Sequence, residues 1–261
     1  MIINAFEEPY SPKRIQQFLL TLIGIIIFYI VDILIAQIIF GKTVDPTLRR
    51  VTQYGSVYSN AGFMGVPLAS SLFGSQGVFF AAASLAAFNI FNWTHGIRLF
   101  QPKQDQLDHK ATLQKVIFNP NIIAIVSGLL IFLLSIKIPF VINQAVKYVG
   151  SINTPLSMIV IGNSLAGIKF NRRMFNGKLL LALIMRNLIF PVIAILILRL
   201  LGISGIAFYT TIVMAACPVA GILVLFTLQA RGNPRQAITL MSISTILSLV
   251  TIPLIFTISK I

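Results

Sequence analysis

Two charged side chains lie inside long apolar stretches of the sequence. Asp32 stands about two-thirds of the way along residues 18–40, and Arg186 stands in the first third of residues 179–201. A charge within a membrane-length segment costs at least a few kcal/mol, so such a residue is a functional candidate by default. We expect Asp32 to be a proton-coupling site and Arg186 to attract an anion or to pair with Asp32. Snorkelling of the Arg186 side chain to the membrane surface is the alternative for that residue.

Glycine and proline interrupt two other apolar stretches. The interruptions read Asn60-Ala-Gly62-Phe-Met-Gly65-Val-Pro67 and Ala216-Cys217-Pro218-Val-Ala-Gly221. Gly costs about 1 kcal/mol and Pro about 3 kcal/mol in a helix interior, and in lipid every freed backbone group needs a new partner. Two such interruptions in corresponding places predict the crossed, broken helices of an inverted-repeat transporter. Ordinary proline kinks are the alternative.

The free amides at the start of a half-helix attract carboxylates without any formal cation. We therefore predict a substrate site at the two breaks, with uncharged amides nearby. Several candidates have a structural role as the alternative to substrate binding. That role is helix capping for Asn60, interhelical hydrogen bonding for Asn89 and Asn163, and packing for Cys217. The candidate substrate-binding residues are Asn60, Gly62, Gly65, Pro67, Asn89, Asn163, Cys217, Pro218 and Gly221.

The elements that position these residues are membrane helices. Charged residues are 10% of the 261 and hydrophobic residues 57%, whereas a soluble domain carries roughly 25% charged residues. A hydrocarbon core of about 30 Å needs helices of roughly 17–25 apolar residues. We predict an all-α integral membrane protein with about eight such spans, at residues 18–40, 51–73, 78–98, 121–134, 142–168 (interrupted at Pro155), 179–201, 206–229 and 237–259.

The spans form two unequal blocks. Residues 1–100 are predicted to hold the last three helices of a first repeat, residues 101–116 a polar connection, and residues 117–261 a second repeat of five helices. Each block contains one broken span, at about 51–73 and 206–229, followed by one further helix. Matching repeats would then place two more helices before Met1. We expect a ten-helix carrier fold of which about eight helices are present.

The basic residues predict the orientation of the chain in the membrane. Most of the 20 Lys and Arg residues fall in alternate connections, within 42–50, 98–115, 169–178 and 231–235. Connections rich in Lys and Arg stay in the cytoplasm. We therefore expect a multi-pass protein of the cell membrane whose central connection is cytoplasmic and whose two ends face outside.

The sparse ionisable residues exclude several classes of site. A single cysteine and two histidines argue against a metal site, and we expect no cofactor. The lone intramembrane acid offers neither a paired-aspartate nor a Ser-His arrangement, so we expect no enzyme. Basic residues placed in membrane connections argue against nucleic-acid binding. No acid follows Asp108, which disfavours a cation substrate and leaves sodium coupling through neutral oxygens open.

Five segments of the sequence are distinctive: Ser59-Asn-Ala-Gly-Phe-Met-Gly-Val-Pro-Leu68, Phe88-Asn-Ile-Phe-Asn-Trp-Thr94, Asn119-Pro-Asn121, Ile161-Gly-Asn-Ser-Leu-Ala166 and Ala216-Cys-Pro-Val-Ala220. In these segments the sequence resembles the auxin efflux carrier family, in its short bacterial branch of malate and malonate permease-like proteins, and the resemblance covers essentially the whole chain. The resemblance implies ten helices in two inverted repeats, crossed broken helices, and a homodimer.

The resulting expectation is a secondary active transporter or facilitator of small organic anions that works by alternating access. A truncated, non-functional or partner-dependent carrier fragment is the first alternative, because two helices of the family pattern lie before Met1. A channel or a passive membrane scaffold is the second. The expected partners are the organic anion and the lipid bilayer.

Overall fold

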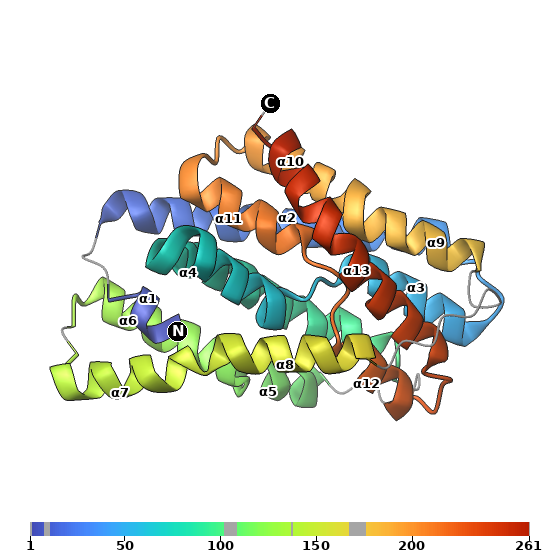
Figure 1. Ribbon diagram of the computed structural model, residues 1–261, viewed down its shortest axis with the longest axis horizontal. Helices are drawn as coiled ribbons and strands as arrows, with labels where there is room; N and C mark the ends of the chain where they lie inside the picture. The colour runs from blue at the N-terminus through green and yellow to red at the C-terminus, as the bar shows by residue number, and fades with distance from the viewer. Residues whose placement is uncertain (1, 8–10, 102–108, 137, 167–175, 261) are drawn as a thin grey trace.

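The computed structural model describes residues 2–7, 11–101, 109–136, 138–166 and 176–260 (Figure 1). Throughout these residues the chain is helical, apart from turns and one isolated β-bridge. The elements, in chain order, are α1 Ile2–Ala5, α2 Pro12–Phe40, α3 Pro46–Val57, η1 Ala61–Gly65, α4 Val66–Phe91, η2 Asn92–Gly96, α5 His109–Ile117, α6 Pro120–Leu133, α7 Phe140–Ser151, α8 Asn153–Ala166, α9 Gly177–Ile184, η5 Met185–Ile189, α10 Phe190–Leu200, α11 Gly205–Ala216, α12 Ile222–Gln229 and α13 Arg235–Ile258. The labels η1, η2 and η5 mark π-helical segments.

The prediction of an all-α membrane protein is confirmed. Within the described ranges, four continuous helical stretches are long and apolar enough to cross a bilayer, at Pro12–Phe40, Ala61–Gly96, Gly177–Leu200 and Arg235–Ile258. Pro120–Leu133 and Gly205–Ala216 are shorter apolar helices. Large apolar side chains such as Ile38, 80% exposed, cover the outer surface, as expected where the surrounding solvent is lipid.

The stretch Ala61–Gly96 folds back on itself at Gly74. The backbone of Gly74 has φ 61° and ψ −146°, a conformation open almost only to glycine. A Cβ built on Gly62 would lie 3.8 Å from the Leu85 side chain, although a straight helix would separate these residues by about 35 Å. The stretch therefore forms two antiparallel helices, which correspond to the second half of the predicted span 51–73 and to the predicted span 78–98.

Both predicted helix breaks are present. α3 ends at Val57 and helical structure resumes at Ala61, while α11 ends at Ala216 and α12 begins at Ile222. The connecting segments are extended, and an antiparallel β-bridge between Ser59 and Val219 joins them. The broken helices therefore cross at their breaks, and we call this junction the crossover.

One detail of the expected organisation is wrong. The predicted span 142–168 is interrupted between α7 and α8, near Ile152, and not at Pro155. Pro155 lies in the first turn of α8, where a missing N–H leaves no intrahelical hydrogen bond unmade. Within the predicted polar connection 101–116, the helix α5 begins at His109.

Two groups of helices surround the crossover (Figure 1). α2, α3, α4 and α9–α13 pack around it, whereas α1, α6, α7 and α8 lie together along one side. We call the second group the arm. Phe6, which follows α1, and Phe132 of α6 pack on Phe79 of α4, with ring centroids 4.8 and 5.2 Å from that of Phe79. The boundary between the arm and the crossover helices is therefore largely apolar.

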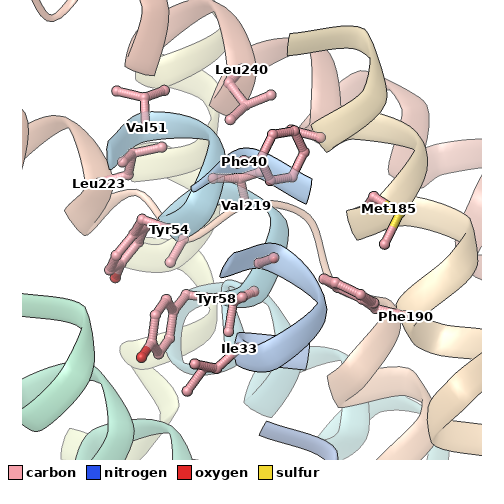
Figure 2. Packing of buried hydrophobic residues seen from close by; sticks show 14 of the residues in the cluster. Ile33, Phe40, Val51, Tyr54, Tyr58, Met185, Phe190, Val219, Leu223 and Leu240 are labelled. Carbon is pink, nitrogen blue, oxygen red and sulfur yellow. The ribbon is translucent and has the colours of Figure 1, made fainter. Parts of the chain in front are cut away.

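A buried apolar cluster fixes α3 beside the second break. In Figure 2, Tyr54 and Tyr58 lie next to Val219 and Ile33. The two tyrosine rings are stacked with centroids 4.4 Å apart, and Tyr29 of α2 stacks on Tyr58 at 5.8 Å. Aromatic pairs at such distances contribute about 0.5–1.5 kcal/mol beyond the area they bury. The column of three tyrosines thus holds α2 and α3 together at the crossover.

Candidate functional site

Backbone hydrogen bonds hold the two broken helices together at the crossover. The N–H of Asn60 donates to the carbonyl of Pro218 at 2.7 Å, and the N–H of Ala220 donates to the carbonyl of Tyr58 at 3.0 Å. These bonds satisfy backbone groups that the helix breaks release inside the membrane. Pro218 accepts a hydrogen bond across the crossover through its carbonyl, and its ring keeps the connecting segment extended.

A chain of side chains also anchors the second break. The N–H of Val219 donates to Oγ of Ser244 at 3.0 Å, and the Ser244 hydroxyl donates to Oδ1 of Asn187 at 3.1 Å. Asn187 in turn donates to the carbonyl of Leu183 in its own helix. The sequence reasoning missed Asn187 and Ser244, because an amide and a hydroxyl 57 residues apart carry no local signal of their pairing.

A cavity of about 460 Å³ lies beside the crossover, between it and the arm. None of the described residues that line it carries a charge. Its walls combine amides with apolar and aromatic side chains. They are Ile2, Ile3, Asn60, Ala61, Gly62, Phe63, Val66, Leu85, Phe88, Asn89, Asn92, Trp93, Asn119, Asn121, Ala124, Val146, Asn153, Ala220, Gly221 and Ile222.

The amino ends of both second half-helices open onto this cavity. The first turn of a helix leaves amides without an intrahelical acceptor, and each end carries a partial positive charge of about half an elementary charge. Gly62 and Phe63 of η1 and Gly221 and Ile222 at the start of α12 line the cavity. Helix ends are therefore the positive features of an otherwise uncharged wall.

Asn60 lies at the first of these ends. Its carbonyl accepts from the N–H groups of Met64 and Gly65, both at 3.1 Å, so its backbone begins the π-helical turn η1. Its side chain makes no capping hydrogen bond and lines the cavity. The side chain of Asn60 therefore borders the cavity and does not cap η1, which was its alternative role.

Asn92 lines the same cavity, although the sequence reasoning did not include it among the site residues. Its Oδ1 accepts from the hydroxyl of Tyr54 at 2.5 Å, while its Nδ2 is buried and has no hydrogen-bond partner within the described structure. Asn92 begins the π-helical segment η2, and such segments frequently occur at functional sites. The spacing of three from Asn89 signalled a shared helix face, but it could not identify Tyr54.

Asn89 is held differently. Its Nδ2 donates to the carbonyl of Leu85 at 2.8 Å in the preceding turn, and the residue also lines the cavity. Nearby, the hydroxyl of Tyr58 lies 3.0 Å from the carbonyl of Phe91 and 2.9 Å from Nδ1 of His95. His95 is thus part of a structural network behind the cavity wall.

Arg186 lies on the opposite side of the crossover and is fully buried. Its Nη1 donates to the carbonyl of Val57 at 2.6 Å and is 3.4 Å from that of Ser56, and its Nη2 donates to the carbonyl of Ala215. Arg186 therefore binds the carboxyl ends of α3 and α11 at once. It neither snorkels to the surface nor lines the cavity, so the anion-attracting role expected for it has no direct contact to support it.

Asp32 of α2 is also fully buried. Neither of its carboxyl oxygens accepts a hydrogen bond from any residue that the structure describes, although the group interacts electrostatically with Arg186. Buried polar groups almost always have partners. The unpartnered carboxyl group of Asp32 is therefore an exception that a structural role does not explain.

The remaining predicted residues lie in three different settings. Gly65 approaches α11 so closely that an added Cβ would stand 2.6 Å from Sδ of Met214, so it is a packing residue. Pro67 is buried in the first turn of α4. Cys217 is buried and donates to the carbonyl of Val213 at 3.3 Å. Asn163 is exposed on α8, outside the lining of the cavity. Gly62 and Gly221 line the cavity, as described above.

The comparisons with known proteins agree with this architecture. The model of the membrane transport protein family matches residues 1–256. The comparison with curated proteins gave no match. Two crossed, broken helices beside an uncharged cavity lined by amides suit a family of transporters. The chain therefore belongs to the membrane transport protein family, that of the auxin efflux carriers, and is a multi-pass membrane transport protein.

Proposed function

We propose that the chain is a secondary active transporter or facilitator of small organic anions, carboxylates of the malate and malonate class, and that it works by alternating access. The observation that carries the proposal is the convergence of two half-helix amino ends on one cavity. Together these ends offer about one positive elementary charge. Because backbone dipoles produce this charge, it remains in place when the substrate is released.

The lining of the cavity supports a carboxylate over a cation. Asn60 and Asn92 line the cavity together with Gly62 and Gly221 at the two helix amino ends. The amide nitrogen of Asn92 has no hydrogen-bond partner among the described residues. Donors to an oxyanion are stronger in a low-dielectric site than in water. Phe63, Phe88 and Trp93 would face the carbon skeleton of the substrate. A volume of about 460 Å³ suits a small molecule and the waters released with it.

An entry route on the arm side belongs to this proposal. A second cavity of about 720 Å³ is lined by Asn4, Lys147 and Thr154 among others. The residues next to these in sequence, Ile3, Val146 and Asn153, line the first cavity. Successive residues of α1, α7 and α8 thus border both spaces. An anion would approach past Lys147 before it reaches the amides.

Coupling and assembly complete the proposal. Asp32 is the candidate proton-coupling residue, because it is a buried acid whose oxygens have no partner within the described structure. We also propose a homodimer in the cell membrane, with the connection 101–116 in the cytoplasm and the two ends of this chain outside. The family resemblance and the distribution of Lys and Arg support these features.

Uptake of radiolabelled malonate and malate into proteoliposomes tests the function. We expect saturable uptake that an excess of unlabelled dicarboxylate inhibits and that Asn60→Ala reduces. Current through the membrane without saturation would favour a channel. Absence of both binding and uptake in a folded, purified sample would reject the proposal and favour a fragment that depends on a partner.

A further inference from the structure

The first half-helices, α3 and α11, bring their carboxyl ends together inside the membrane. The last carbonyls of a helix have no intrahelical donor, and each end carries about half a negative elementary charge. In lipid these groups need partners more than they do in water. Two such ends at one point amount to about one negative charge, which makes a ready site for a cation.

Arg186 occupies this site with its own guanidinium group. It donates to Val57 of α3 through Nη1 and to Ala215 of α11 through Nη2. The planar fork of a guanidinium presents several donors in a fixed geometry, so one side chain can serve two carbonyl ends at once. Without this guanidinium, the same carbonyl oxygens would have to bind another cation, such as a lysine ammonium group or a free alkali ion.

The surrounding sequence fixes the guanidinium in place. Arg186 belongs to the π-helical turn η5, Met185–Ile189, and the adjacent Asn187 reaches the second crossing segment through Ser244. Arg186 and Asn187, which are consecutive in one helix, thus both hold the crossover. Arg186 donates to backbone carbonyls of α3 and α11, and Asn187 accepts a hydrogen bond through its side-chain oxygen. Asp32 lies near enough to interact electrostatically with Arg186, but no described residue donates a hydrogen bond to its carboxyl oxygens.

We propose that Arg186 is a built-in cation that takes the place of an alkali ion at the carbonyl side of the crossover. Its positive charge keeps the two first half-helices together throughout the transport cycle. No sodium ion is then needed at this point. The consequence for transport, which rests on the function proposed above, is that uptake proceeds at the same rate in sodium, potassium and choline media.

The first experiment measures thermal unfolding of the purified protein in detergent, without any substrate. Wild-type protein is expected to melt at the same temperature in sodium chloride and in choline chloride. Arg186→Ala should lower the melting temperature by roughly 10 °C, because it leaves two helix ends unpaired. Millimolar methylguanidinium, which restores the missing group, should recover part of this loss.

Arg199→Ala is the matched control. Arg199 lies on α10, in the same continuous helical stretch, and donates to the carbonyl of Ser259 at 3.0 Å, away from the crossover. Its loss should give a smaller shift and no response to methylguanidinium. Arg186→Lys keeps the charge without the fork, so its melting temperature should lie between those of wild type and Arg186→Ala.

Selective stabilisation of the wild type by sodium would overturn the proposal. Equal responses of Arg186→Ala and Arg199→Ala to methylguanidinium would do the same. If Arg186→Ala does not fold, the comparison of wild type in sodium and choline still decides the matter. Melting and uptake are read separately, so absence of uptake counts against the proposed function alone, whereas sodium-dependent uptake by the wild type counts against the role of Arg186.

Discussion

The hydroxyl of Tyr54 donates to Oδ1 of Asn92 over 2.5 Å, and this bond leaves the amide nitrogen of Asn92 as a donor without a partner within the described structure. The two residues come from α3 and from the start of η2. Tyr54 is fully buried and lies outside the lining of the cavity, whereas Asn92 lines it. Under the proposed function, Tyr54 is a positioning residue that fixes the orientation of the Asn92 amide at the cavity wall.

Removal of this hydroxyl should weaken substrate binding. In Tyr54→Phe the amide of Asn92 can rotate, and we expect KM for the carboxylate to rise by about fivefold, in line with the loss of one hydrogen bond of about 1 kcal/mol. Initial rates of uptake over a range of substrate concentrations give KM and the maximal rate separately. Tyr148→Phe, on the exposed face of α7, is the control. An unchanged KM in Tyr54→Phe would contradict the positioning role.

Asn60 should contribute directly to binding. Its side chain lines the cavity and makes no capping bond, so Asn60→Ala removes a donor without disturbing the helix start. We expect about a tenfold rise in the dissociation constant, as for the loss of a hydrogen bond to a charged group. Asn163→Ala, on the exposed part of α8, should leave binding unchanged. Calorimetric titration with malonate distinguishes these outcomes, and equal affinities in the two variants would remove Asn60 from the site.

A larger residue at Gly65 should require the Met214 side chain to move. An added Cβ would stand 2.6 Å from Sδ of Met214 and 3.5 Å from Sγ of Cys217, so in Gly65→Ala the flexible end of Met214 must shift. We expect a loss of about 1 kcal/mol in the free energy of unfolding. Gly162→Ala is the control, because nothing lies within 4 Å of the added methyl group. Recovery of stability in the double variant Gly65→Ala, Met214→Ala would identify the clash as the cause.

Asp32 should control the response of transport to a proton gradient. Asp32→Asn keeps the shape of the side chain and abolishes its titration, so uptake should lose its dependence on an imposed pH difference while substrate binding persists. Asp45→Asn serves for comparison, because Asp45 caps α3 through its Oδ1 and asparagine caps equally well. A variant Asp32→Asn that still follows the pH difference would show that another group couples the proton.

The places where the chain departs from regular helix could be predicted from the sequence. Glycine and proline destabilise a helix interior wherever they occur in the sequence. Gly62, Gly65 and Pro218 therefore locate both helix breaks to within a few residues. Pro155 shows the limit of this reasoning, because proline interrupts only a helix interior and Pro155 lies in a first turn. The reversal at Gly74 falls between the predicted spans 51–73 and 78–98.

The partners of the site residues could not be predicted in the same way. Arg186 is separated by 129 residues from the carbonyl of Val57 that it binds. Its apolar neighbours in the sequence allowed attraction of an anion, pairing with Asp32 and snorkelling. The choice among these depends on where two other helices end in space. Tyr54 and Asn92 pose the same difficulty, because 38 residues, the first helix break and the reversal at Gly74 separate them. Local periodicity carries no information on such contacts.

The backbone bridge between Ser59 and Val219 has a consequence for how the protein can move. Its hydrogen bonds are directional, and breaking them in a nonpolar medium would expose groups that find no water. Under the proposed function, the crossed half-helices would then move as one rigid body. Contacts between Phe6, Phe79 and Phe132 are non-directional and can be exchanged at little cost. The apolar boundary between the arm and the crossover helices is therefore the surface along which the proposed alternating-access movement would slide.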